Sequence, residues 1–288
     1  VAAFFTLSGW SPPGFATPCA YESRYYCIGV FSGEERNLPG ARLLRLDALT
    51  QSVNHEDPAY LAYSHLQWMD ELVRHRFGDG PFAAFVIGGG GYTLPRSWLD
   101  RDPTTAVTVA ELDPLVTAIA REQLWFEPGP RTEILHQDAR VALARMAEER
   151  RFDVIVGDAF RDVALPAHLI TDEFHALVAD RLTADGFYVV NIIDAVQPRR
   201  LVASALETLR HRFHTVEVWY DATAYQMSDT INFIVYASAR PSGLESPLEA
   251  SSAPATSWAR LADPAIAASR DTIFLTDDFA PVERLFGR

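Results

Sequence analysis

The sequence contains no lysine, so all 25 of its basic residues are arginines. A Schiff-base mechanism needs a lysine amine, and the G-K-[ST] loop needs a lysine beside the phosphates. The absence of lysine therefore excludes both covalent amine catalysis and P-loop hydrolysis.

Cysteine is scarce, with only Cys19 and Cys27 present. Two thiols, with no pair of histidines at ligand spacing nearby, are too few for a zinc cluster, so we expect no metal site. The two residues could form one disulfide in an oxidising compartment or remain as two buried thiols. We favour thiols, because two cysteines are weak evidence of compartment.

Long apolar runs are also missing, and none approaches the roughly 20 residues that cross a bilayer. The apolar start of the chain, Val1-Ala-Ala-Phe-Phe-Thr-Leu, is too short for a signal peptide. Because the chain begins at Val1 rather than at a methionine, we expect it to be part of a longer protein.

Length and charge narrow the class of protein further. The 288 residues, 48% of them hydrophobic, allow one large domain or a domain with a smaller appendage. A net charge of -13 argues against a nucleic-acid partner, whose phosphates need a basic face. An acidic field suits a cationic substrate, although acidity can also serve solubility alone.

The chain divides into three expected parts. Residues 1–76 hold an irregular proline-rich lead-in, a small antiparallel β-domain and a linking helix. Residues 77–240 alternate strands and helices, and residues 241–288 form a loop and a C-terminal segment. In the first part we expect strands at 25–31, 41–46 and 50–53 and a helix at 58–77.

The middle part predicts an α/β fold with a Rossmann-like (methyltransferase-type) doubly wound seven-stranded sheet, preceded by the small antiparallel β-domain. Expected strands are 82–87, 107–111, 133–136, 154–156, 187–193, 216–220 and 232–237, and expected helices are 114–123, 139–149, 172–182 and 199–213.

The first of these strands runs into four consecutive glycines, Gly88-Gly-Gly-Gly91. Glycine lets the chain turn sharply and lets a ligand approach the backbone. The next strand ends in Glu111, 20 residues beyond Gly91, and a carboxylate at this offset can accept hydrogen bonds from both ribose hydroxyls. The pattern predicts a nucleotide-ribose site built from Gly88, Gly89, Gly90 and Glu111. A turn that serves only chain reversal is the alternative.

The turn lacks the third glycine of G-x-G-x-x-G, which would fall at Thr93. A compact adenosyl ligand is therefore favoured over a pyrophosphate, and a Rossmann oxidoreductase is disfavoured.

Acids follow four successive strands: Glu111, Asp138, Asp158 and Asp194. Ligands of doubly wound sheets lie beyond the carboxyl ends of the strands, so we expect these acids to gather at one edge. For Asp138 and Asp194, service as helix N-caps is an equal alternative.

The motifs Gly-Gly-Gly, Glu-Leu-Asp113, Gln-Asp138-Ala and Asp-Val-Ile-Val-Gly-Asp158, preceded by Leu46-Asp-Ala-Leu-Thr-Gln51, resemble the spermidine synthase family in their order. The resemblance covers residues 21–237. It implies a transferase that moves an aminopropyl group from decarboxylated S-adenosylmethionine (or uses S-adenosylmethionine itself) onto a polyamine, without a prosthetic group or metal.

The resemblance also implies roles for individual residues. Asp158 matches the proton acceptor, Glu111 the acid on the ribose, Asp138 with Ala139 the adenine contact, and Gln51 the glutamine that contacts the nucleoside. Pro166 falls on the cofactor side and Asp162 on the substrate side. Tyr60 or Tyr63 would line the acceptor pocket, with core packing as the alternative.

The chain departs from the family at two places. Gly91 replaces the acid that follows the three family glycines, and Asp162 and Pro166 match only with one residue inserted after Asp158. Arg161 adds a positive charge to that loop. Two alternatives follow. One is an S-adenosylmethionine-dependent methyltransferase in which Arg161 meets the ligand carboxylate, and the other is a non-catalytic nucleoside- or polyamine-binding domain.

The segments 88–96, Pro166-Ala-His168 and Leu275-Thr-Asp-Asp-Phe-Ala-Pro are similar to spermidine-synthase-like domains of multi-pass membrane proteins. That similarity implies a membrane region outside this chain. Otherwise we expect a cytoplasmic homodimer. His168 could be a second base or a structural, capping histidine.

Overall fold

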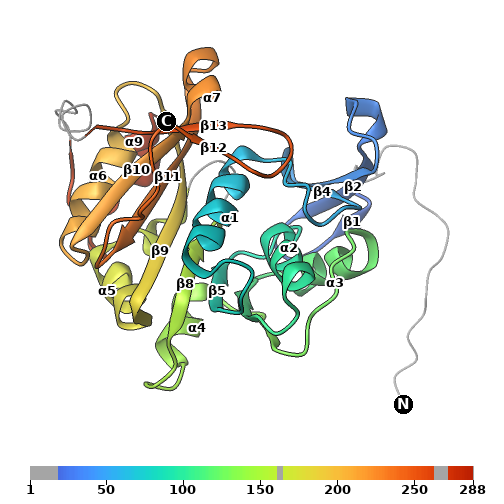
Figure 1. Ribbon diagram of the computed structural model, residues 1–288, viewed down its shortest axis with the longest axis horizontal. Coiled ribbons are helices and arrows are strands. Elements are labelled where there is room, and N and C mark those ends of the chain that lie inside the picture. The colour runs from blue at the N-terminus through green and yellow to red at the C-terminus, as the bar shows by residue number, and fades with distance from the viewer. Residues whose placement is uncertain (1–18, 161–164, 263–271, 288) are drawn as a thin grey trace.

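The computed structural model describes residues 19–160, 165–262 and 272–287, which form two sheets (Figure 1). The small N-terminal sheet is antiparallel, with strand order β1-β2-β3-β4. Its strands are β1 (Tyr21–Glu22), β2 (Cys27–Ser32), β3 (Ala41–Leu46) and β4 (Leu49–His55), and a short 3-10 helix, η1 (Glu34–Arg36), follows β2.

The large sheet has nine strands in the order β12-β13-β10-β11-β9-β8-β5-β6-β7. Strands β9, β8, β5, β6 and β7 are parallel, and the remaining four add on antiparallel beyond β9. The strands are β5 (Ala83–Ile87), β6 (Ala106–Ala110), β7 (Thr132–Leu135), β8 (Phe152–Gly157), β9 (Leu182–Ala195), β10 (Thr215–Asp221), β11 (Thr230–Ser238), β12 (Leu248–Glu249) and β13 (Ser257–Arg260).

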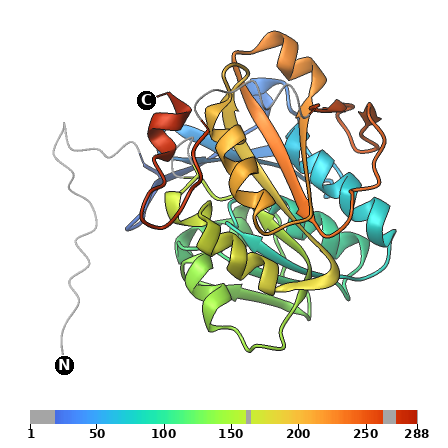
Figure 2. The same cartoon turned by 90° about the vertical axis from the view of Figure 1, so that its left-hand side faces the viewer.

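Helices cover both faces of this sheet, as Figures 1 and 2 show. One face packs against α1, α2 and α3, and the other against α4, α5, α6 and α9. The helices are α1 (Ser64–Phe77), α2 (Thr93–Arg101), α3 (Pro114–Gln123), α4 (Ala139–Arg145), α5 (Asp172–Asp180), α6 (Arg200–Arg210), α7 (Ala222–Met227) and α9 (Val282–Phe286), with a 3-10 turn η2 (Ala167–Leu169) before α5.

The two cores follow from strand periodicity. In β5, Phe85 and Ile87 enter the core beneath α4, α5 and α6, whereas Ala84 and Val86 enter the core beneath α1, α2 and α3. A parallel strand covered on both faces is apolar throughout, as the run before the glycines predicted. The Rossmann-like doubly wound fold and the small antiparallel sheet before it are confirmed.

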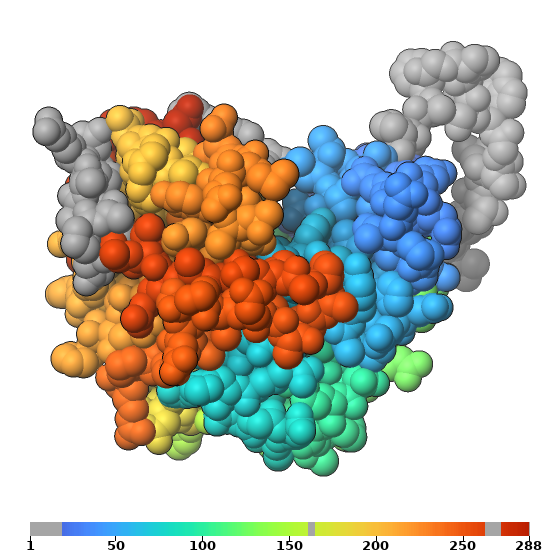
Figure 3. Space-filling model, turned by 45° about the horizontal axis from the view of Figure 1, so that its top comes forward, coloured from blue at the N-terminus to red at the C-terminus, as the bar shows by residue number. Residues whose placement is uncertain are grey.

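The sheet holds nine strands rather than seven, because the segment expected to be a loop supplies β12 and β13. Composition rich in serine, proline and alanine concealed these short strands. Trp258 of β13 is fully buried, and its ring centre lies 6.4 Å from that of Trp68 in α1. In Figure 3 this orange-red segment lies beside the cyan region that contains α1. Just before α1, the amide of Leu61 donates to the carbonyl of Ala253 over 3.2 Å.

The helix expected at 58–77 begins only at Ser64. Before it, Asp57 accepts a hydrogen bond from the Ala59 amide over 2.9 Å, and the Tyr60 amide donates to the Asp57 carbonyl over 3.2 Å. An aspartate that satisfies the amide two residues on favours a turn over a helix. The ends of the other helices and strands differ from the expected ends by a few residues.

A buried carboxylate ties α1 to α2. Asp70 is 1% exposed and accepts hydrogen bonds from Arg74 over 2.8 Å, from the Trp98 indole over 3.0 Å, and from Arg101. Two arginines and an indole satisfy the charge where solvent does not reach.

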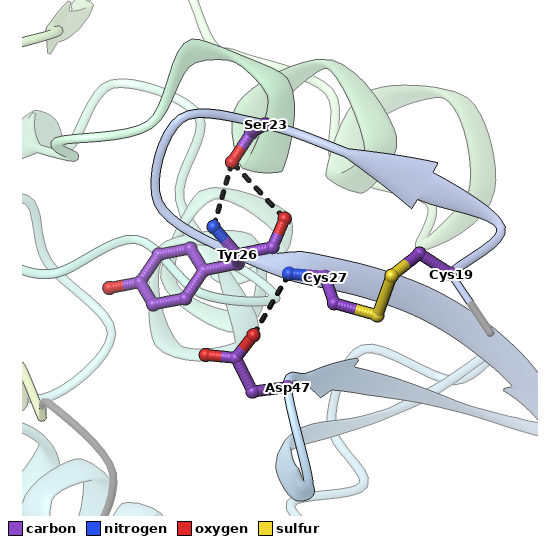
Figure 4. Close-up of a disulfide and its surroundings, with 5 residues drawn as sticks. All are labelled: Cys19, Ser23, Tyr26, Cys27 and Asp47. Atoms are coloured by element: carbon purple, nitrogen blue, oxygen red, sulfur yellow. Dashed lines mark hydrogen bonds between the residues drawn. A yellow bond between two sulfur atoms is a disulfide. The ribbon is translucent and has the colours of Figure 1, made fainter. Parts of the chain in front are cut away.

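The expectation of free thiols is wrong, because Cys19 and Cys27 form a disulfide at the edge of the small sheet (Figure 4). Strand pairing explains it: β1 pairs with β2 in a hairpin, and this brings the two residues together. Asp47 accepts a hydrogen bond from the Cys27 amide over 2.9 Å.

Within the three described ranges, every helix is too short or too polar to cross a membrane.

Candidate functional site

The glycine turn lies between β5 and α2, at the carboxyl edge of the sheet. Gly88 has φ +91°, and a Cβ there would lie 3.1 Å from the carbonyl oxygen of Asp158 on the loop after β8. Only glycine combines this conformation with this close approach. The turn therefore brings the end of β5 against the end of β8.

Glu111, which follows β6, closes the turn from the other side. One carboxylate oxygen accepts hydrogen bonds from the amides of Gly89 and Gly90 over 2.8 and 3.2 Å, and the other accepts from the Asp113 amide over 2.8 Å. Burial raises the pKa of Glu111, although these amide bonds oppose the shift. The predicted pairing of turn and acid is present.

Gly91 joins the turn to the small sheet. Its amide donates to the Ser52 hydroxyl over 2.8 Å, and its carbonyl accepts from the Asn54 amide group over 2.7 Å. Gln51 stands at a β-bulge, because Leu44 pairs with Ser52 whereas the next residue of β3 pairs with Thr50. Bulges redirect side chains beside functional sites. Gln51 thus lies next to the strand residues that contact the turn.

Asp138 lies at the start of α4, one strand further along the same edge. One of its oxygens accepts from the Val141 amide over 3.1 Å, which confirms the N-cap alternative, and the other lies 2.7 Å from Nε2 of His168. The His168 hydrogen bond holds the pKa of Asp138 below its ordinary range. Ala139 is the first residue of α4, and Pro166 directly precedes η2, which carries His168. His168 therefore contacts the carboxylate of Asp138.

Asp158 lies at the end of β8 with its side chain 25% exposed. One oxygen accepts from the Asn191 amide group over 3.0 Å, and the other lies 3.7 Å from Nε2 of His65. The His65 ring stacks on Tyr63 with 5.5 Å between ring centres. Burial raises the pKa of Tyr63, and the charge of Asp158 acts in the same direction. Tyr63 therefore belongs to the surroundings of Asp158.

Tyr60 and Asp194 make contacts of a different kind. Tyr60 is half-buried, and its ring centre lies 4.7 Å from that of the half-buried His55. Asp194 accepts hydrogen bonds from the amides of Ala195 and Val202, over 2.8 and 2.9 Å, at the start of α6. Asp162 and Arg161 lie outside the described residues.

Sequence reasoning missed His65, Asn191, Ser52 and Asn54. His65 lies in the expected helix at the spacing of its apolar residues, and helical spacing gives no sign that it faces a strand end. The polar residues of β4 follow the glutamine motif directly, and that position was the available signal.

No family model matches the chain. A polyamine aminopropyltransferase from Vibrio vulnificus is 32% identical over 49% of this chain and 48% of its own length. An N-terminal histidine N-methyltransferase from Emericella nidulans is 29% identical over 63% of this chain and 33% of its own length. The chain thus spans about half or less of these curated relatives.

Among solved structures, a probable spermidine synthase from Corynebacterium glutamicum superposes with a TM-score of 0.67 and 25% identity, over 78% of this chain and 81% of that one. The chain therefore resembles spermidine synthases in sequence over about half of its length and in fold over most of it, as its motifs predicted.

Proposed function

We propose that the chain transfers an aminopropyl group from decarboxylated S-adenosylmethionine to an amine acceptor, with Asp158 as the general base. The observation that carries the proposal is the gathering of Glu111, Asp138 and Asp158 at the carboxyl ends of β6, β7 and β8, on either side of the glycine turn that follows β5. The relatives named as polyamine aminopropyltransferases support the reaction class.

The reaction makes one demand on the protein. An acceptor ammonium has no lone pair, so it must lose a proton before its nitrogen attacks the carbon attached to the sulfonium. The new bond joins nitrogen to carbon, the carbon–sulfur bond breaks with its electrons moving to sulfur, and methylthioadenosine leaves. The proton passes to a carboxylate and then to water.

Asp158 is suited to accept that proton. Asn191 fixes one oxygen by a 3.0 Å hydrogen bond, so the carboxylate does not rotate freely. The other oxygen faces His65 at 3.7 Å, and a quarter of the side chain reaches solvent. A fixed base with a route to water can take up a proton and release it. Tyr63 would then form part of the acceptor wall.

The adenosyl end offers both polar and apolar surface. Leu112 directly follows Glu111 and is 41% exposed, and Val141, in the first turn after Asp138, is 38% exposed. Exposed apolar side chains beside hydrogen-bonding acids suit an adenine ring with its ribose. We assign the ribose to Glu111 and the Gly88–Gly90 turn, the adenine to Asp138 and Ala139 beside Pro166, and a nucleoside contact to Gln51.

The test is to mix the protein with decarboxylated S-adenosylmethionine and a series of amines, and to measure methylthioadenosine and the alkylated amine. Asp158→Asn should lower the turnover number at least about 100-fold, because a lost general base costs that much. Its affinity for methylthioadenosine should stay within about threefold, since Asp158 is assigned to the acceptor side. Asp180→Asn, an exposed aspartate at the end of α5, is the control and should change neither value.

A methyltransferase is the second candidate, and Gly91 favours it, because the family's amine-binding acid is replaced there. The relative named as an N-methyltransferase adds weight. Calorimetry separates the two proposals: an aminopropyltransferase binds decarboxylated S-adenosylmethionine more tightly than S-adenosylmethionine, and a methyltransferase shows the reverse order. Binding without turnover, unaffected by Asp158→Asn, would identify a binding domain.

The polyamine acceptor, the homodimer, the role of Asp162 and a membrane region outside the chain remain proposals. The Cys19–Cys27 disulfide weighs against a cytoplasmic location, because such bonds persist mainly in oxidising compartments. Counting free thiols in protein isolated from its native host under alkylating conditions tests this point.

A further inference from the structure

The C-terminal segment 275–279, which the proposed reaction does not use, is anchored beside the adenine end of the site. Leu275 is fully buried, its carbonyl accepts from the Asp172 amide over 2.9 Å, and its amide donates to the Thr208 hydroxyl over 3.0 Å. Thr276 and Phe279 then exchange two backbone hydrogen bonds of 3.1 and 3.0 Å. Asp277 therefore stands on a tight turn whose base is fixed.

From this turn, Asp277 forms hydrogen bonds with residues of both α4 and α5. Its carboxylate accepts hydrogen bonds from both terminal nitrogens of Arg140 and, over 2.7 Å, from the Thr171 hydroxyl. Its amide donates to the Glu173 carboxylate over 3.0 Å. A two-pronged guanidinium–carboxylate contact fixes orientation as well as distance. The Thr171 hydroxyl also holds the carboxylate, and the bond to Glu173 holds the backbone of Asp277.

Arg140 links Asp277 to the proposed adenine site. It is the second residue of α4, two positions after Asp138, and it also donates to the carbonyl oxygen of His168 over 3.2 Å. His168 in turn places Nε2 at 2.7 Å from Asp138. A continuous chain of contacts thus joins Asp277 to Asp138 through Arg140 and His168.

We propose that Asp277 is a positioning residue that orients Asp138 toward the amino group of the adenine, and so sets the choice of base. This inference rests on the proposed adenosyl site. Each Asp138 oxygen already accepts one hydrogen bond and keeps a second lone pair. Fixing the carboxylate on two sides holds the free lone pairs in one direction, where the adenine 6-amino group can donate.

The preference for adenine over hypoxanthine is the property that tests the role of Asp277. Adenine presents a donor at position 6, whereas hypoxanthine presents an acceptor that a carboxylate repels. A carboxylate held in place distinguishes the two, and one that rotates freely loses part of that discrimination. General damage to the site would weaken both nucleosides alike.

The experiment measures the dissociation constants of methylthioadenosine and methylthioinosine by calorimetry. Asp277→Asn should weaken methylthioadenosine about tenfold, the value of one weakened hydrogen bond to a charged group, and leave methylthioinosine nearly unchanged. Arg140→Lys keeps the charge but loses the two-pronged contact, so it should shift the ratio in the same direction. Asp278→Asn, the same substitution at the exposed neighbouring residue, is the matched control and should leave the ratio unchanged.

Equal losses for both nucleosides, or no loss in either Asp277→Asn or Arg140→Lys, would overturn the proposal. Circular dichroism and urea unfolding show whether each variant is folded. A wild-type protein that binds methylthioadenosine but transfers no aminopropyl group would refute the proposed reaction and leave this inference standing. A wild-type protein that binds neither nucleoside would refute both.

Discussion

A buried histidine far from the proposed chemistry should make stability depend on pH. His175 of α5 is fully buried against Phe174 and Tyr188, and neither ring nitrogen has a hydrogen-bond partner among the described residues. Burial lowers the pKa of His175 from 6.5 to about 3. The folded protein therefore keeps this ring neutral at pH values where the unfolded chain protonates it.

The sign and size of the effect follow from linkage. Below pH 6.5 the unfolded chain binds a proton at His175, and the folded protein does not bind it until about pH 3. The free energy of unfolding therefore falls as the pH falls from 6.5 to about 3. Between pH 7 and pH 5 this one group should lower the free energy of unfolding by about 2 kcal/mol.

The assay is urea unfolding of wild type and His175→Leu at pH 7 and pH 5. Other titrating groups contribute to both proteins, so the difference between them isolates the histidine. The variant should lose about 2 kcal/mol less than wild type on acidification. His214→Leu removes an exposed histidine and should behave as wild type. Equal losses in wild type and His175→Leu would refute the reasoning.

Two further substitutions test the connections around the turn and between α1 and α2. Gly91→Asp should lower the free energy of unfolding by about 2 kcal/mol and fail to improve amine binding, because its Cβ would lie 2.6 Å from the Asn54 side-chain oxygen and 2.7 Å from Cβ of Ser52. If Gly91→Asp left the free energy of unfolding in urea unchanged, β4 would be able to move aside for the new side chain. Asp70→Asn should cost about 3 kcal/mol by the same measurement, since it leaves Arg101 buried without its partner. Asp100→Asn, on the exposed side of α2, is its control and should cost almost nothing.

The sequence predicted the parts of the molecule that local pattern determines. An apolar strand, a glycine turn and an acid 20 residues later lie close together in the chain, and Glu111 indeed holds the amides of Gly89 and Gly90. The parallel order of the strands then carried Asp138 and Asp158 to the same edge. Each prediction needed only the periodicity of one element and the connection rule of the fold.

What escaped prediction depends on contacts between distant segments. His65 has the spacing of a core residue, and only the packing of α1 brings its imidazole to Asp158. The C-terminal Thr-Asp-Asp motif was noticed, but Arg140 lies 137 residues before Asp277. Strand β13 was missed because one tryptophan, Trp258, rather than a run of apolar residues holds it in place.

The docking of Gly91 against β4 has a consequence for how such sites change over evolutionary time. Placing an acid at this position takes one substitution, yet Ser52 and Asn54 on another sheet occupy the space for its side chain. We therefore expect an acid at position 91 to be tolerated better when Ser52 or Asn54 is also replaced. The choice of residue at position 91 is therefore coupled to β4, the same strand that carries Gln51, the proposed nucleoside contact.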